Sequence, residues 1–176
     1  MEFMDVVEAR YSYKQKFLDT PVPWEHLEEI AKAGLMAANA MNAQCVHLVI
    51  LENKKAIEPL LDIAARDRLE SAPAAIAVFT DNSSQQDFKN FEMEDYSAAT
   101  ENMLLAATNL GYASVWLDGP YFDEKAERAV SKVLKVPETF HLRVILPIGH
   151  PAEEEIRRPK KAFWERVSVN VFGEKK

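Results

Sequence analysis

The chain has 176 residues, of which 48% are hydrophobic, 28% charged and 10% aromatic, and its formal net charge is −7. This length and composition predict one globular domain over residues 1–176, and the acidic balance disfavours general nucleic-acid binding, which rewards a basic surface. The apolar runs are too short to span a bilayer, and we see no secretory leader at the N-terminus. With Cys45 as the single cysteine, an internal disulfide is excluded. We therefore expect a cytoplasmic protein with no membrane segment.

Hydrophobic periodicity predicts alternating helices and strands in the first half of the chain. Pro21 and Pro23 mark the entry to the clearest early helix, and asparagines mark its exit. In chain order we expect a helix over 4–12 with Val6 and Val7 inward, a helix over 19–40, a buried strand over 46–52, a helix over 54–70 and a second buried strand over 73–80.

A polar stretch over 81–94 opens the second half and predicts a long surface loop. The helix expected next, over 95–111, is apolar over most of its surface, and Gly111 suits the position just after its end. Beyond it we expect a strand over 113–119, a helix over 123–135, a strand over 141–149 and a charged tail whose valines at 167, 169 and 171 alternate as in a late edge strand.

This order of elements predicts a single α+β or α/β domain with a sheet of about four or five strands. The tail has no obvious place in a compact monomer. Because an exposed last strand must be covered, pairing with a second subunit is one common remedy.

Several kinds of chemistry are disfavoured by what the sequence lacks. Its five glycines are scattered, so neither a dinucleotide-binding G-x-G-x-x-G nor a phosphate-binding P-loop is present. The four histidines lack metal-ligand spacing, and Cys45 has no evident base partner. We therefore expect no metal site and no hydrolase site, and a bound phosphate would need side-chain donors.

Cations of this acidic chain gather in two places. Arg10, Lys14 and Lys16 lie near the start, and a second group follows at Arg157, Arg158, Lys160 and Lys161. Taken alone, each group is typical of a solvated surface, and the first also suits an exposed helix terminus.

Three segments together resemble the nitroreductase family of flavin enzymes. They are Arg10-x-Ser12-x-Lys14, AANAMNAQ at 37–44 and NLGYASVWLDGP at 109–120, and their order, spacing and chain length all match. The resemblance implies a three-layer α/β/α fold with a mixed, mostly antiparallel sheet. It also implies a homodimer that exchanges its C-terminal segment (152–176) and binds FMN at the subunit interface, with NAD(P)H as reductant.

The resemblance also implies roles for individual residues. Arg10, Ser12 and Lys14 match positions that hold the phosphate and the polar edge of the flavin ring, and Arg158 and Lys160 match a basic pair that closes on the phosphate. Gly119 matches a glycine whose amide faces the reactive flavin nitrogen. The residues matched to the motif that reaches a partner's flavin are Asn39, Asn42 and Gln44.

Some positions depart from the family pattern. Ala38 and Asn39 replace Pro-Ser, Met41 replaces a common glycine, and Cys45 and Val46 replace Pro-Trp. Met41 could narrow the substrate pocket. The predicted lid contributes further pocket candidates, Phe88, Phe91 and Met93, which could equally pack the loop down.

The resemblance implies ping-pong transfer from NAD(P)H through FMN to a nitroaromatic, a quinone or a similar small acceptor. The flavin carries the chemistry, so we assign no catalytic side chain. Two alternatives stay open: a non-catalytic flavin store or sensor, and a cofactor-free dimeric protein on the same fold.

Overall fold

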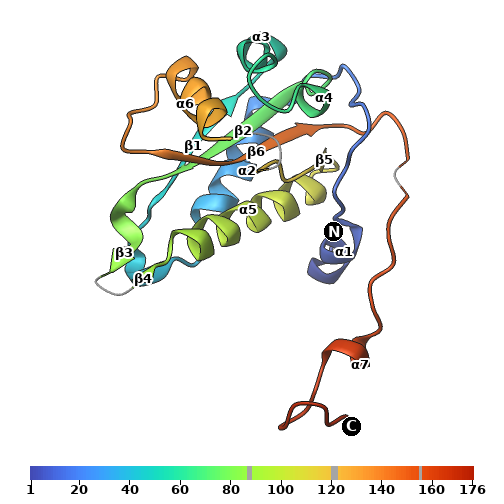
Figure 1. Cartoon of the computed structure of the whole chain (residues 1–176). Helices are drawn as coiled ribbons and strands as arrows, with labels where there is room; N and C mark the ends of the chain where they lie inside the picture. The colour runs from blue at the N-terminus through green and yellow to red at the C-terminus, as the bar shows by residue number, and fades with distance from the viewer. Residues whose placement is uncertain (87–88, 120–122, 155) are drawn as a thin grey trace.

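The computed structural model describes residues 1–86, 89–119, 123–154 and 156–176, and a four-stranded sheet lies at its centre (Figure 1). The strand order is β1-β2-β6-β5, and every pair of neighbours is antiparallel. The predicted mixed character is limited to a one-residue parallel bridge between Ser12 and Ser114. The strands are β1 (Val46–Leu51), β2 (Ala74–Thr80), β6 (His141–Gly149) and β5 (Ala113–Ser114).

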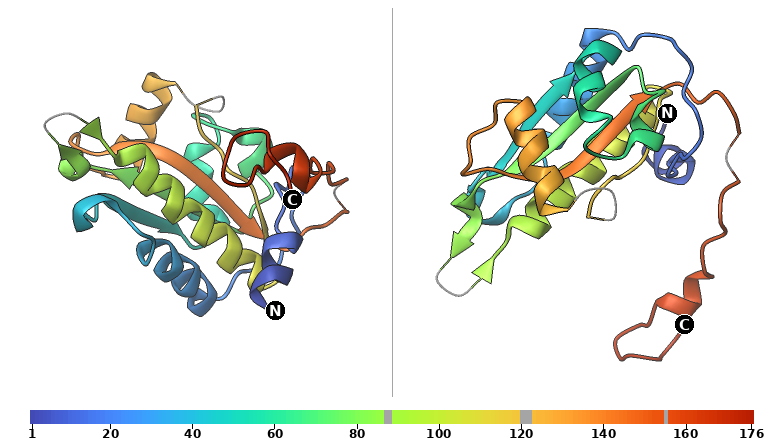
Figure 2. Two further views of the ribbon diagram at one scale, coloured as in Figure 1. Left: turned by 90° about the horizontal axis from the view of Figure 1, so that it is seen from below. Right: turned by 45° about the horizontal axis from the view of Figure 1, so that its top comes forward.

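Helices cover both faces of the sheet, which confirms the three-layer arrangement (Figures 1 and 2). On one face lie α2 (Trp24–Leu35) and the long α5 (Glu92–Asn109); on the other lie α3 (Lys54–Ile57), α4 (Arg66–Leu69) and α6 (Glu124–Val133). The sheet therefore separates two hydrophobic clusters. All seven residues of β2 are buried, because helices cover that central strand on both sides.

The layer of α2 and α5 depends on one small residue. Gly34 packs so closely on α5 that an added Cβ would lie 2.7 Å from Cγ of the fully buried Met103. Helix α5 ends as the sequence predicts: Leu110 is its C-cap, and Gly111 follows with a left-handed φ of 83°.

Several predicted elements are shorter or more broken than the periodicity indicates, among them the helix expected over 19–40, which is reduced to α2. The helix expected over 54–70 divides into α3, the 3-10 turn η2 (Glu58–Leu60) and α4, because Pro59 lacks an amide hydrogen and Ala65 has a left-handed φ of 51°. The strand expected over 113–119 keeps two residues. Helix α1 (Phe3–Ala9) buries Val6 but leaves Val7 40% exposed, so the inward orientation predicted for Val7 is wrong.

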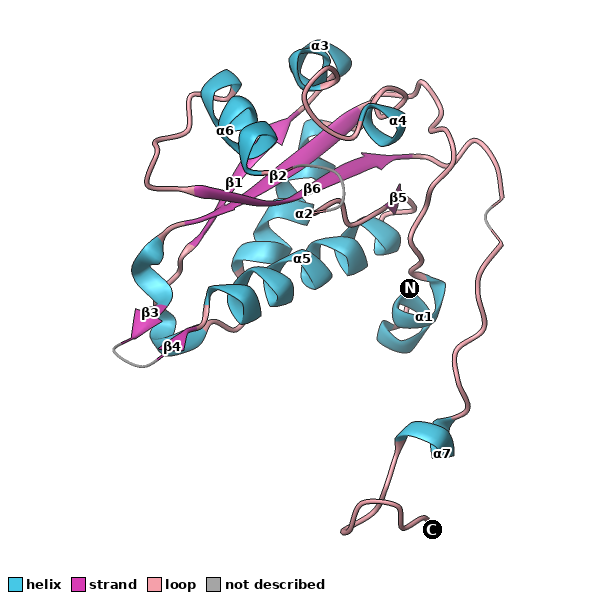
Figure 3. Cartoon of the chain, viewed as in Figure 1, coloured by secondary structure: helices cyan, strands magenta, loops and turns pink. Residues whose placement is uncertain are grey.

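The polar segment between β2 and α5 is partly ordered into short elements (Figure 3). After the 3-10 turn η3 (Asn82–Ser84), two-residue strands β3 (Gln85–Gln86) and β4 (Lys89–Asn90) form an antiparallel pair. Helix α5 then begins at Glu92, three residues before the predicted start. Phe88, a predicted lid residue, lies outside the described residues.

The tail leaves the body of the molecule after β6 and runs past α1 to the short helix α7 (Phe163–Arg166) (Figures 1 and 3). The late edge strand predicted for 167–171 does not form in this single chain. Large apolar side chains of the tail are exposed, among them Ile156 at 92% and Phe172 at 100%. Nothing within the described part of one chain therefore provides the tail with a hydrophobic core.

Candidate functional site

The basic stretch after α1 runs as an extended segment beside β5. The Tyr13 amide donates to the Ser114 carbonyl at 2.9 Å, next to the bridge formed by Ser12. Successive side chains of an extended segment point to opposite sides, so Tyr13 is fully buried whereas Ser12 and Lys14 are exposed. Two predicted phosphate-binding residues therefore share the solvent side of one well-anchored segment.

Arg10 lies at the C-terminal end of α1 and reaches toward α5. Its Nε is 3.3 Å from Oε1 of Glu101, and the two side chains are 20% and 49% exposed. An ion pair with a partner this exposed contributes about 0–1 kcal/mol to the stability of the fold. Arg10 can therefore exchange Glu101 for an anionic ligand with little loss of stability.

Backbone hydrogen bonds hold the segment after β6 against this N-terminal stretch. The Leu18 amide donates to the His150 carbonyl at 2.9 Å, and the Ala152 amide donates to the Lys16 carbonyl at 3.0 Å. The chain thus leaves the sheet alongside residues 16–18 before it reaches the second basic group.

Arg157 extends this contact into the second basic group. Its guanidinium carbon lies 4.4 Å from the ring centroid of Tyr11, and its Nη1 donates to the Glu8 carbonyl at 3.4 Å. Arg158 and Lys160, the predicted phosphate-closing pair, are exposed nearby in sequence. The family motif does not include Arg157, although an aromatic residue between the cations of the first group is a sequence signal for such stacking.

The hydroxyl of Ser114 is buried but has no hydrogen-bond partner among the described residues. Buried polar side chains almost always have a partner in folded proteins. Ser114 is joined through its backbone to Ser12 and Tyr13, so this unsatisfied hydroxyl lies beside the basic stretch. A polar ligand bound beside the basic stretch would supply the hydrogen-bond partner that this hydroxyl lacks.

The motif at 37–44 forms a turn with an unusual backbone. Met41, Asn42 and Gln44 have left-handed φ values of 52°, 56° and 54°. Inside the turn, Oδ1 of Asn39 accepts a hydrogen bond from the Gln44 amide at 2.9 Å. Asn39 therefore shapes the turn, while Met41, 81% exposed, and the exposed Asn42 project outward.

The turn and the basic stretch meet different sides of α5. The turn contacts α5 at Asp95, which accepts a hydrogen bond from the Ala40 amide, and Arg10 contacts α5 at Glu101. Six residues along an α-helix rotate the side-chain direction by about 240°, which leaves the two directions about 120° apart. One chain therefore does not join the predicted residues of the turn to those of the basic stretch.

The predicted glycine at the flavin nitrogen follows a short aromatic and acidic segment. Trp116 Nε1 donates to Oδ2 of Asp118 at 3.0 Å, and the ring centroid of Trp116 is 6.3 Å from that of Tyr96 on α5. Burial raises the pKa of the Tyr96 phenol, so this group stays neutral at ordinary pH. Gly119 is exposed, and a Cβ added there would meet no atom of the described residues within 4 Å. Packing among those residues thus does not require glycine at this position.

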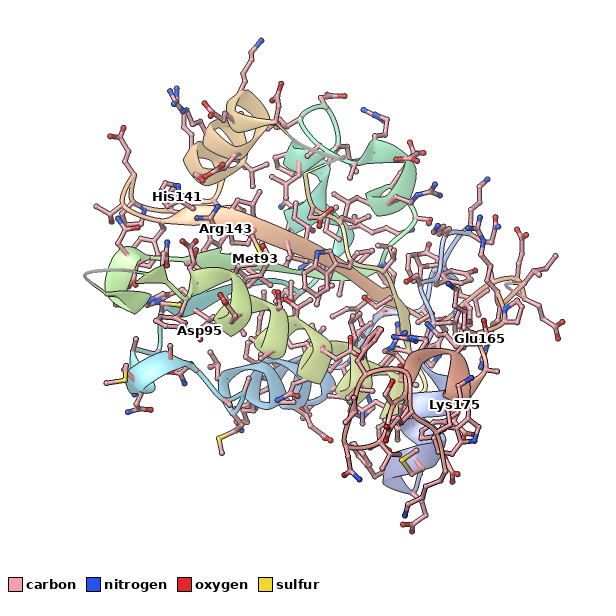
Figure 4. All side chains as sticks on the ribbon, turned by 60° about the horizontal axis from the view of Figure 1, so that its bottom comes forward. Met93, Asp95, His141, Arg143, Glu165 and Lys175 are labelled. Carbon is pink, nitrogen blue, oxygen red and sulfur yellow. The ribbon has the colours of Figure 1, made fainter. Side chains whose placement is uncertain are left out.

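Two predicted lid residues flank the beginning of α5. Phe91 is the N-cap residue and is half-buried, whereas Met93 is 66% exposed (Figure 4). Phe91 therefore packs the segment down in part, and Met93 remains accessible to a ligand or a second chain.

Between these two residues, Glu92 joins the segment to the sheet through a buried polar network. Its carboxylate accepts hydrogen bonds from the Thr80 hydroxyl and, at 3.0 Å, from Asn90 Nδ2, and it pairs with Arg143 of β6. Arg143 Nε also donates to the Thr80 hydroxyl at 2.9 Å. Burial of Glu92 raises the pKa of its carboxyl, but these hydrogen bonds and the Arg143 charge outweigh burial and hold that pKa below its ordinary value.

Two hollows of the surface differ in their relation to these residues. One of about 450 Å³ lies between α2, the 37–44 turn and β1, and Asn39, Gln44 and Asp95 line part of it. A larger hollow of about 1170 Å³ lies against α6 and residues 135–143, and it contains none of the predicted site residues.

In the part of the chain that the structure describes, no group of three histidine, cysteine or acidic side chains is arranged to hold a metal ion. Across those same residues, none of the helices combines the length and the apolar character needed to cross a membrane.

Comparison with known proteins identifies the class to which this fold and these segments belong. The profile of the nitroreductase family matches residues 7–68 and 64–150. The chain therefore belongs to the nitroreductase family.

Individual relatives agree with this membership. A protein of Archaeoglobus fulgidus named "Putative NADH dehydrogenase/NAD(P)H nitroreductase" is 32% identical over 155 residues, which cover 88% of each chain. A solved nitroreductase family protein of Clostridium difficile 630 superposes with a TM-score of 0.82 at 27% identity, covering 97% of this chain and 99% of that one. An FMN-dependent nitroreductase of Clostridium difficile R20291 gives a TM-score of 0.80 at 25% identity, covering 96% and 99%.

Proposed function

We propose that this protein is an FMN-dependent oxidoreductase that passes reducing equivalents from NAD(P)H to a nitroaromatic, a quinone or a similar small acceptor. The observation that supports this most is the contact between Arg157 and Tyr11, which places the second basic group beside the first in a chain of net charge −7. Such a concentration of cations suits a phosphate dianion. The FMN dependence of the Clostridium difficile R20291 relative also supports the proposal.

The phosphate of FMN would be held by side chains, since the sequence has no glycine-rich loop. Ser12 and Lys14 are exposed on the outer side of the anchored segment, and Arg10 is held by a single exposed carboxylate. Arg158 and Lys160 would close on the phosphate from the tail. The unsatisfied Ser114 hydroxyl gives the site one more polar group that a ligand could complete.

The flavin ring would lie against the segment that ends at Gly119. The open space at its missing Cβ fits a close approach of the ring to the backbone amide. The pocket for the acceptor would be lined by Met41, Phe91 and Met93. NAD(P)H and the acceptor would use this pocket in turn, which gives ping-pong kinetics.

A second copy of the chain would complete each site. Asn39, Asn42 and Gln44 lie on a different side of α5 from the basic stretch, and the apolar side chains of the tail are exposed. A homodimer in which residues 152–176 pack on the partner explains both facts. The turn of one subunit would then reach the flavin held by the other.

FMN, when bound, supplies hydride and electron transfer between NAD(P)H and the acceptor. The chain's own residues would neutralise the phosphate, orient the ring and limit access of water. Near the ring, cations such as Arg10 and Lys14 would favour negative charge on the reduced flavin. We assign no acid or base role to any side chain.

The test is an absorbance spectrum of the purified protein together with FMN titration of two matched variants. Lys14→Ala should weaken FMN binding by about tenfold or more, because it removes a charge-assisted contact to phosphate. Lys16→Ala, a change of the same kind two residues on, should leave binding unchanged. A colourless protein that ignores added FMN, or equal loss in both variants, would contradict the proposal.

The kinetic part of the proposal needs its own measurement. Parallel lines in double-reciprocal plots of NAD(P)H oxidation at several acceptor concentrations would support transfer by the ping-pong route. A protein that binds FMN but oxidises no NAD(P)H with nitroaromatic or quinone acceptors would instead be a flavin store or sensor.

A further inference from the structure

We propose that Asp95 is the positioning residue of the 37–44 turn and of Cys45, which follows it, and that its buried carboxylate holds this turn preformed for the flavin of a second copy. The second half of this statement rests on the function proposed above; the first half concerns the chain alone. Figure 4 shows Asp95 near the beginning of α5.

The turn needs an external support because its backbone is strained. Of the six non-glycine residues with positive φ among the described residues, three are Met41, Asn42 and Gln44. Asparagine tolerates this conformation, but methionine and glutamine gain nothing locally that offsets the steric clash of Cβ. Strained residues persist where the surrounding structure fixes them, and they concentrate at binding sites.

Asp95 touches both ends of the turn. Its Oδ1 accepts a hydrogen bond from the Ala40 amide at 2.8 Å, and its Oδ2 lies 3.5 Å from Sγ of Cys45. Asp95 is 3% exposed and Cys45 is fully buried, so these contacts are shielded from water. One carboxylate thus fixes the spacing between the entry and the exit of the strained residues.

Other contacts also shape the turn, and one of them joins residues 39 and 44. Asn39 closes the turn from within through the Gln44 amide, and the exposed Ser83 hydroxyl donates to the Ala43 carbonyl at 3.3 Å. Both of these contacts lie at an exposed surface, where water can replace them. Asp95 provides the buried attachment to α5, the longest helix of the fold.

The consequence is that Met41 and Asn42 are presented outward on a fixed backbone. A ligand that needs this conformation binds more weakly when only a fraction of molecules adopts it, in proportion to that fraction. Loss of the Asp95 carboxylate should therefore weaken cofactor binding although Asp95 itself touches no cofactor.

The test compares three variants of the flavin-loaded protein. Asp95→Ala removes both contacts, and Asp95→Asn keeps a carbonyl oxygen for the Ala40 amide. Thr100→Ala is the matched control, because Thr100 is another fully buried polar residue of α5 whose hydroxyl bonds within the helix, to the Tyr96 carbonyl. Two quantities are measured: the rate of FMN release after dilution, followed by fluorescence, and hydrogen exchange at the Ala40 amide.

We expect Asp95→Ala to release FMN at least about tenfold faster than the parent and to lose protection at Ala40, since the preformed turn is no longer the dominant state. Asp95→Asn should restore most of both properties, and Thr100→Ala should change neither. Unchanged protection at Ala40 in Asp95→Ala would overturn the proposal, as would equal FMN release in Asp95→Ala and Thr100→Ala.

The two measurements also separate this proposal from the proposed function. A parent protein that binds no FMN would refute the function, and with it the flavin role of the turn. Hydrogen exchange at Ala40 would still show whether Asp95 fixes the backbone.

Discussion

The buried pair of Glu92 and Arg143 gives the sharpest test of how the sheet holds the beginning of α5. Replacing Arg143 with methionine leaves a carboxylate whose side chain is only 8% exposed without its cation. Removing one partner of a buried ion pair costs about 3–5 kcal/mol. Because Thr80 and Asn90 still donate to Glu92 and Arg143 is itself 28% exposed, we expect a smaller loss, about 2–4 kcal/mol.

A double-mutant cycle isolates the pair from the rest of the network. Glu92→Gln keeps an oxygen for Thr80 and removes the charge, so Arg143→Met should cost much less in that background. The coupling free energy should be about 1.5–3 kcal/mol. Urea unfolding of the four proteins measures it, at fixed protein and FMN concentrations because association and bound cofactor shift apparent stability.

The pH dependence gives an independent check. The folded-state pKa of Glu92 is below its ordinary value, so its contribution to stability is complete above the unfolded-state pKa of about 4.3 and is lost as the pH falls through the lower folded-state pKa. In Arg143→Met, Glu92 stays buried but has lost its cation, so its pKa rises. Protonation of Glu92 then removes the cost of burying an unpaired carboxylate. The difference in free energy of unfolding between the parent and Arg143→Met should therefore become smaller as the pH falls from 7 to 4.

Two results would refute this reasoning. One is a coupling free energy within about 0.5 kcal/mol of zero, which is the range expected for independent sites. The other is a deficit of Arg143→Met that stays constant from neutral to acidic pH.

Three further changes test other parts of the structure. Gly34→Ala should lower the free energy of unfolding by about 1–3 kcal/mol in urea denaturation, because its Cβ would lie 2.7 Å from Cγ of Met103, and an unchanged midpoint would contradict this packing. Asp123→Ala should cost about 1 kcal/mol by removing the cap on the Ala126 amide, whereas Asp123→Asn should cost much less. Deleting residues 156–176, whose apolar side chains are exposed, should convert the proposed dimer to a monomer in light scattering; a truncated protein that stays dimeric would show that the tail is not the exchanged element.

The sequence predicts the order and the layering of the main elements because those follow from hydrophobic period. The strand over 73–80 is an example: β2 spans Ala74–Thr80 and is buried throughout. The positions of breaks are less predictable. Pro59 could have indicated the end of α3, but the left-handed conformation of Ala65 carries no sequence signal, since alanine ordinarily favours helix.

The residues of the candidate site also fall into two groups, those that the sequence could indicate and those that only the fold reveals. Arg10, Ser12 and Lys14 could be selected from a motif; Ser12 and Lys14 are exposed and Arg10 is half-buried, and their role in binding a flavin stays a prediction. Asp95 could not, because an acid in the first turn of a helix is ordinarily explained by the helix dipole. Its role depends on Ala40, which is 55 residues away in sequence. Only the fold shows that one carboxylate meets both ends of the turn.

The turn and the tail share one physical feature, which connects the two proposals. Each has a local feature that is unfavourable by itself. Met41 adopts a left-handed φ that ordinarily requires glycine, and the alternating valines after Arg166 pair with no strand in the described part of the chain. A conformation that is locally unfavourable, or a segment with exposed apolar groups, is retained when contacts elsewhere stabilise it. For the turn that contact is Asp95, inside the chain. For the tail, the described residues of one chain contact Arg157 but leave apolar side chains such as Phe172 exposed, and the proposed second copy would cover them.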